Sequence, residues 1–113
     1  MAKKVIKARP RFVDYHETLL EALKDPKEAV AYLNAALEES KDGSQESQQL
    51  LLIAFKNVAL AQGGISNLAT KTGLGRESLY KTLSKRGNPK LTTLTTLISA
   101  MGFDLKISLQ PKQ

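Results

Sequence analysis

A group of chemically versatile side chains is concentrated in one short stretch of this 113-residue chain. Arg76 and Glu77 are adjacent, and hydroxyl and amine groups follow them within one helical turn. Arginine can donate two hydrogen bonds to O6 and N7 of guanine, and a carboxylate can accept one from N4 of cytosine. We therefore expect contacts to base edges of double-stranded DNA from Arg76, Glu77, Ser78, Tyr80 and Lys81.

Basic side chains flank this stretch. Residues 65–90 hold six basic residues and a single acid. Lys and Arg contact phosphates whatever the base sequence, so they fix the position of a protein on a duplex. The expected phosphate contacts are Lys71, Lys85, Arg86 and Lys90. An ordinary helical hairpin with a solvated charged face is the alternative.

Two helices joined by a tight turn are needed to present these groups to a DNA groove. A helix-turn-helix joins its helices with three or four residues that often include glycine. Ala69 is small enough for close helix packing, Gly73 can adopt a positive φ, and Gly75 is acceptable as an N-cap. The leucines expected to form the core between the two helices are Leu68, Leu74, Leu79 and Leu83.

The N-terminal half contains two further predicted helices. The spacing of Leu19, Leu20 and Leu23 predicts a short helix that stops at Asp25. Asp25 then resembles an N-cap, with Pro26 at the first helical position and Glu28 placed as in a capping box. The stripe expected on this second helix is Val30, Leu33, Ala36 and Leu37.

The remaining helices lead to an all-α fold. A third helix, from Ser44 to the glycine pair 63–64, has an apolar face that includes Leu50 and Ile53 and should be central to the core. Further helices are predicted at about 66–72, 76–86 and 91–101. We expect a compact bundle of about five to six helices that contains the helix-turn-helix.

The C-terminal tail changes its periodicity. Phe103, Leu105, Ile107 and Leu109 alternate with polar residues, which is the pattern of a short, half-buried β-strand. A strand needs a partner for its backbone groups. The partner is either the region of residues 5–6 or the same strand of a second subunit, and we favour the second arrangement, in a homodimer.

Charge divides the chain unevenly within a formal net charge of +6. A basic arm, 1–13, holds five basic residues and no acid, whereas a helical segment, 14–43, holds eight acids and three lysines. The helix-turn-helix domain at 44–102 is basic again, and the strand and tail occupy 103–113. Such asymmetry indicates two partner surfaces of opposite sign. A solvated acidic face beside a disordered basic tail is the alternative.

The residue inventory argues against an enzyme. There is no cysteine, the one histidine is His16, and no phosphate-binding glycine loop is present, so we expect no catalytic site, metal or cofactor. No apolar stretch is long enough to span a membrane. The basic start lacks the apolar region of a signal peptide, so we expect a cytoplasmic protein.

Several motifs resemble a known family. Leu68-Ala69, Gly73-Leu74 and Gly87-Asn88-Pro89 resemble the lambda-repressor/Cro type of helix-turn-helix. Across about residues 18–109 the chain looks more specifically like the HigA-like antidote proteins of bacterial addiction modules. That resemblance rests on two separate segments, 22–38 and 76–84.

The resemblance implies two activities. Such proteins neutralise a small RelE-like ribonuclease toxin and repress their own operon as DNA-binding dimers, which also implies a bacterial, nucleoid-associated location. Two positions depart from the repressor pattern: Ile65 replaces a frequent glutamine, and Thr82 an apolar residue. Because these toxins are usually basic, toxin contact is expected from Glu17, Glu21, Glu28, Glu38 and Glu39.

Two other functions fit parts of the same sequence. A phage- or plasmid-type repressor without a toxin partner would use 14–43 only to extend its core or dimer interface. A protein-interaction adaptor with an incidental basic patch would show no sequence-specific DNA binding.

Overall fold

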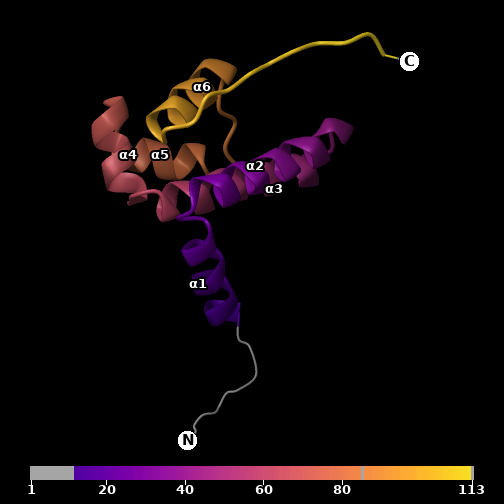
Figure 1. Cartoon of the computed structure of the whole chain (residues 1–113). Helices are drawn as coiled ribbons and strands as arrows, with labels where there is room; N and C mark the ends of the chain where they lie inside the picture. Colours follow the sequence, from indigo (N-terminus) through magenta and orange to yellow (C-terminus); the bar gives the residue numbers. More distant parts are fainter. Residues whose placement is uncertain (1–11, 85, 113) are drawn as a thin grey trace, which may run out of the picture.

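The described part of the chain consists of helices and connecting loops from Phe12 to Ala100, followed by a non-helical C-terminal segment (Figure 1). The computed structural model describes residues 12–84 and 86–112, and in them six α-helices and one short 3-10 helix, with no strand. The all-α prediction and the expected number of helices are confirmed. The elements are α1 (Phe12–Ala22), α2 (Pro26–Glu39), η2 (Ser40–Asp42), α3 (Gln45–Ala61), α4 (Gly64–Thr72), α5 (Arg76–Thr82) and α6 (Leu91–Ala100).

The junction between α1 and α2 has the predicted N-cap at Asp25 but not the predicted capping box, since the Asp25 amide donates to the Ala22 carbonyl at 3.2 Å rather than to Glu28. Pro26 begins α2, and the Asp25 carboxylate accepts a hydrogen bond from the Lys27 amide at 2.9 Å. Gln62 ties this junction to the end of α3, because its Nε2 donates to the carbonyl oxygens of Leu23 at 2.7 Å and Lys24 at 3.2 Å. Beyond this tie, α1 projects away from the other helices (Figure 1).

A hydrogen-bonded turn reverses the chain between α2 and α3. Gly43 has a φ of 72°, which favours glycine. The Asp42 carboxylate accepts from the Ser44 amide at 2.8 Å and from the Ser47 hydroxyl at 2.6 Å. Ser44 caps α3 by accepting from the Ser47 amide at 3.1 Å. One of the first free amides of α3, that of Ser47, is thereby satisfied. The two long helices α2 and α3 pack side by side.

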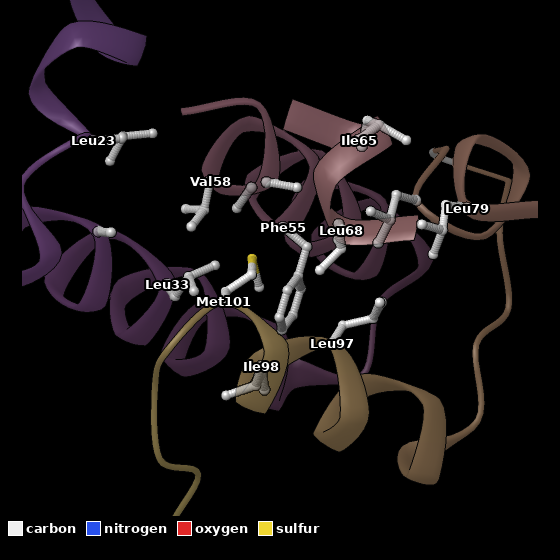
Figure 2. Packing of buried hydrophobic residues seen from close by; sticks show 14 residues of the cluster. Leu23, Leu33, Phe55, Val58, Ile65, Leu68, Leu79, Leu97, Ile98 and Met101 are labelled. Carbon is white, nitrogen blue, oxygen red and sulfur yellow. The ribbon is translucent and has the colours of Figure 1, made fainter. Parts of the chain in front are cut away.

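The core is built around α3, which packs against α1, α2, η2 and α4. Figure 2 shows Phe55 of α3 beside Leu68 of α4 and Leu97 of α6, and all three side chains are buried. The central position expected for α3 is therefore confirmed. Ala29 and Leu33 bring α2 onto the same cluster.

Three apolar positions assigned to predicted stripes are exposed instead. On α3, Leu50 is 57% exposed and Ile53 38% exposed, and on α2 Val30 is 39% exposed. The helices packed against α2 and α3 cover a narrower face of each than the spacing of its leucine, isoleucine and valine residues predicts. On α2 the fully buried position is Ala29, which a leucine-based stripe overlooks.

Two predicted element boundaries are wrong. Helix α5 ends at Thr82 rather than at Arg86, because Leu83 caps it and Gly87 folds back against its last turn. At Gly87 an added Cβ would meet the Thr82 carbonyl oxygen and lie 2.9 Å from that of Lys81. The second wrong boundary is the start of α4, which lies at Gly64 rather than at residue 66.

The strand predicted near the C-terminus is not formed in the single chain. Residues 103–112 leave α6 as an extended segment (Figure 1), and their one backbone hydrogen bond within the described chain runs from the Phe103 amide to the Ile98 carbonyl, 3.1 Å. A strand requires a hydrogen-bonding neighbour, and the described residues provide none. The alternative partner near residues 5–6 lies outside the described residues, as do residues 1–11 of the basic arm predicted at 1–13.

Candidate nucleic-acid and partner surfaces

Helices α4 and α5 are joined by three residues. Gly73 has a φ of 75°, and its amide donates to the Ala69 carbonyl at 2.9 Å. The Thr72 hydroxyl donates to the Leu68 carbonyl at 2.8 Å and accepts from the Leu74 amide at 3.2 Å. These bonds close α4 and set the direction in which the chain enters α5 at Gly75, an extended N-cap without a side chain.

Buried leucines hold α5 in place. Leu79 and Leu83 are each 1% exposed, and Leu68 of α4 is buried in the same cluster. Leu74, expected to join them, is 38% exposed. It lies in the turn itself rather than on either helix, so the helical spacing that buries the other leucines does not extend to it.

The outer side of α5 carries every residue predicted to contact bases. Arg76, Glu77, Ser78, Tyr80 and Lys81 are all exposed, whereas Leu79 between them is buried. None of these charged side chains forms an ion pair with another described residue. Their donors and acceptors are therefore available to an incoming ligand.

The predicted phosphate-binding residues are spread over three elements. Lys71 is in the last turn of α4, Arg86 is in the loop after α5, and Lys90 is the N-cap of α6; all three are exposed. Lys85 lies outside the described residues. A groove of about 710 Å³ borders Arg86, between the start of α3 and this loop, and its walls include Gln45, Gln48 and Asn88.

One residue near α5 escaped the sequence-based prediction. Lys56 of α3 places its ammonium group 5.6 Å from the centre of the Tyr80 ring, which is within cation–π range. This contact joins residues 24 positions apart, so no local pattern reports it. It orients the Tyr80 ring and adds a cation beside the exposed side of α5.

The acidic residues do not form one patch. Glu17 and Glu21 lie on the projecting helix α1, Glu28 in the first turn of α2, and Glu38 and Glu39 at its end; all are exposed. Ten residues of helix separate Glu28 from Glu38, which is about 15 Å. Two of the five carboxylates already have lysine partners, since Glu21 pairs with Lys24 at 3.0 Å and Glu38 with Lys41 at 2.9 Å.

The acidic region includes one carboxyl with a perturbed pKa. Hydrogen bonds from the Ser47 hydroxyl, the Ser44 amide and the Ser44 hydroxyl hold the pKa of Asp42 below the usual aspartate value. These donors stabilise the charged form of Asp42, which lowers its pKa, and the same hydrogen bonds hold its side chain in the turn between α2 and α3.

In the described chain no three His, Asp or Glu side chains are arranged to hold a metal ion. No helix among the same residues is long and apolar enough to cross a membrane.

Comparison with known proteins identifies the family. A family model described as "Probable addiction module antidote protein" matches residues 13–109. The chain belongs to this antidote family. A relative from Haemophilus influenzae, described as an uncharacterized protein, is 32% identical over 87 residues, which cover 77% of this chain and 82% of the relative. No solved structure matches the chain. Membership of the antidote family indicates an antitoxin role and, in general, a toxin partner.

Proposed function

We propose that this antidote binds and neutralises a small, basic, RelE-like ribonuclease and, as a homodimer in the bacterial cytoplasm, represses its own operon. The α4–turn–α5 unit acts as a lambda-repressor/Cro type helix-turn-helix on double-stranded operator DNA. The chain acts as a HigA-like antidote, and the acidic residues of α1 and α2 bind the toxin. The proposal assigns no catalytic step, metal or cofactor to the chain.

The observation that carries the DNA-binding proposal is the arrangement of α5. Its start presents a guanidinium, a carboxylate and a hydroxyl group that form no ion pair with another described residue, while the buried Leu79 and Leu83 hold the inner side of the helix. A rigid helix whose N-terminal turn carries such groups suits the major groove. The net positive charge of residues 65–90 supplies attraction to the phosphates.

The DNA-binding proposal is tested with single variants on operator and random duplexes. Arg76→Ala should weaken operator binding by about 1–3 kcal/mol and relax the preference at one base position, because a bidentate contact is lost. Lys85→Ala should weaken binding to all DNA and lower the salt slope by about one. Lys27→Ala, an exposed charge on α2, is the control and should change neither. Equal losses of Arg76→Ala on both duplexes would assign Arg76 to phosphate.

The toxin-binding proposal is supported by family membership and by the projection of α1. Among the described side chains of α1, Leu19 packs against the core, and Leu23 and Gln62 hold the junction that follows the helix. Glu17 and Glu21 lie four residues apart, on one face of this helix, and both are exposed. Tyr15, on another face, is 67% exposed. Exposed carboxylates fit a basic protein surface, and an exposed aromatic ring is a common interface side chain.

Two double variants test which acidic group binds the toxin. Glu17→Lys with Glu21→Lys changes α1, and Glu38→Lys with Glu39→Lys changes the end of α2. Each pair should impair neutralisation of toxin growth arrest while sparing operator binding. Glu46→Lys, an exposed acid at the start of α3, is the matched control. Full neutralisation by both double variants would refute the separation of the toxin and DNA surfaces.

A single experiment distinguishes the antitoxin from a repressor without a toxin. The full chain is co-expressed with the product of its adjacent gene, purified, and tested by gel shift on their common promoter. Co-purification with a small basic protein, together with a specific shift, supports both activities. A specific shift without a bound partner would favour the phage- or plasmid-type repressor.

A further inference from the structure

The C-terminal segment has one apolar side that the chain covers only in part. Phe103 and Leu105 are partly buried against the helical core. Ile107 and Leu109 continue the same two-residue alternation but are 61% and 95% exposed. In an extended chain these four side chains lie on one side. The first two are therefore anchored on the core, and the next two extend past its edge.

The charges on the opposite side of this segment are self-complementary. Residues 103–107 read Phe-Asp-Leu-Lys-Ile, so an acid and a base stand symmetrically on either side of Leu105. An antiparallel pair centred on Leu105 places Asp104 of each copy opposite Lys106 of the other. Centring the pair on Lys106 would oppose two lysines, and centring it on Asp104 would oppose two aspartates. Directly opposed like charges are destabilising in a sheet, whereas opposite charges stabilise it.

We propose that residues 103–107 of two copies of this chain pair as antiparallel strands about Leu105. In this register Ile107 of one copy lies beside Phe103 of the other. The exposed Ile107 side chain is therefore covered, next to the helical core of the second copy. The backbone groups of residues 104–107 make no hydrogen bond within the described chain, and the pairing gives partners to those of every second residue. A two-stranded ribbon alone is marginal in water, but Phe103 and Leu105 attach this one to both helical bodies.

This pairing rests on the homodimer of the proposed function and specifies its interface. The test of the pairing uses neither DNA nor toxin. A failed pairing test therefore leaves the DNA and toxin proposals standing, and failure of those leaves the pairing intact. The full chain is studied by sedimentation equilibrium. Asp104→Lys and Lys106→Asp are each expected to weaken the dimer about ten- to hundredfold, because two attractive cross-strand pairs become repulsive. Both side chains are exposed, so the fold of each chain is preserved.

Recombination of the two variants tests the register itself. Asp104→Lys mixed with Lys106→Asp should form a mixed dimer as tightly as the unaltered chain, since every opposed pair is again a lysine and an aspartate. The double variant carrying both changes should dimerise normally for the same reason. Lys112→Asp alters the net charge by the same amount outside the paired residues and is the control, expected to leave the dimer unchanged.

The outcomes that overturn the proposal are distinct. A monomeric full chain at every concentration would remove the second copy and favour pairing within one chain. Unaltered dimers of both single variants would place the interface elsewhere. Single variants that are weakened but not rescued by mixing would exclude the register about Leu105. As an independent measure, Ile107→Ser should weaken the dimer with little change in the stability of the isolated chain; equal dimerisation would contradict the proposal.

Discussion

Gly87 allows the loop after α5 to fold against the end of that helix, and replacing it with alanine tests this packing. The added Cβ would meet the Thr82 carbonyl oxygen, and it would lie 2.7 Å from the Thr82 carbonyl carbon and 2.9 Å from the Lys81 carbonyl oxygen. All three are backbone atoms, so no side-chain rotation relieves the overlap. Either the loop or the last turn of α5 must move.

The expected cost of Gly87→Ala follows from this geometry. Overpacking of a tight site costs about 1–3 kcal/mol, and backbone obstacles place Gly87 in the upper part of that range. The hydrogen bond from the Gly87 amide to the Ser84 carbonyl, 2.8 Å, would also be disturbed. A loss of about 2–3 kcal/mol corresponds to a decrease in Tm of roughly 10–20 °C for a domain of this size.

The assay is thermal and urea unfolding followed by circular dichroism, with Gly75→Ala as the control. At Gly75 the nearest atom to an added Cβ is the Ser78 hydroxyl oxygen at 3.6 Å, an ordinary contact, and φ is −69°. The control should lose no more than about 1 kcal/mol, the usual penalty of alanine at an N-cap. A Tm of Gly87→Ala equal to that of the unaltered chain would refute the steric account of where α5 ends.

Two further predictions concern the ends of α3. Asp42→Asn should destabilise the fold at pH 7, because a lowered pKa means that the charged form stabilises the folded state. This contribution is present above the unfolded pKa of about 3.9 and is lost as pH falls through the lower folded pKa, so urea unfolding should show a larger effect at pH 7 than at pH 3. Equal effects at both pH values would show that charge is irrelevant there. Gln62→Met should cost about 1–2 kcal/mol in the same assay, because the bonds to Leu23 and Lys24 are lost at similar side-chain volume, and an unchanged midpoint would contradict the role of the tie.

Local chemistry allowed much of the fold to be predicted from the sequence. Asp25 and Pro26 mark a helix start by their own hydrogen-bonding and φ preferences, and Gly73 marks a turn that needs a positive φ. Leu79 of α5 and its C-cap Leu83 were correctly assigned to the core because their four-residue spacing is helical. The exposure of the predicted base-contacting residues follows from the same periodicity.

The features missed by the sequence analysis depend on tertiary structure. Leu83 and Ser84 are compatible with a longer helix, and α5 stops where it does because Gly87 packs against it. The contact between Lys56 and Tyr80 joins distant segments that no periodic pattern connects. The C-terminal alternation was recognised, but a single chain offers no neighbour with which to form a strand.

The attachment of α1 implies that the molecule is not uniformly stable. Among the described side chains of α1, only Leu19 packs against the core cluster, so opening the described part of this helix should expose much less buried surface than unfolding the bundle around Phe55. Its amide hydrogens should therefore exchange with solvent well before those of α3, and proteases should cleave there first. Binding of the proposed toxin to α1 would slow both processes. Cleavage in the unbound state would remove neutralising activity from a chain whose α4–α5 unit is still folded.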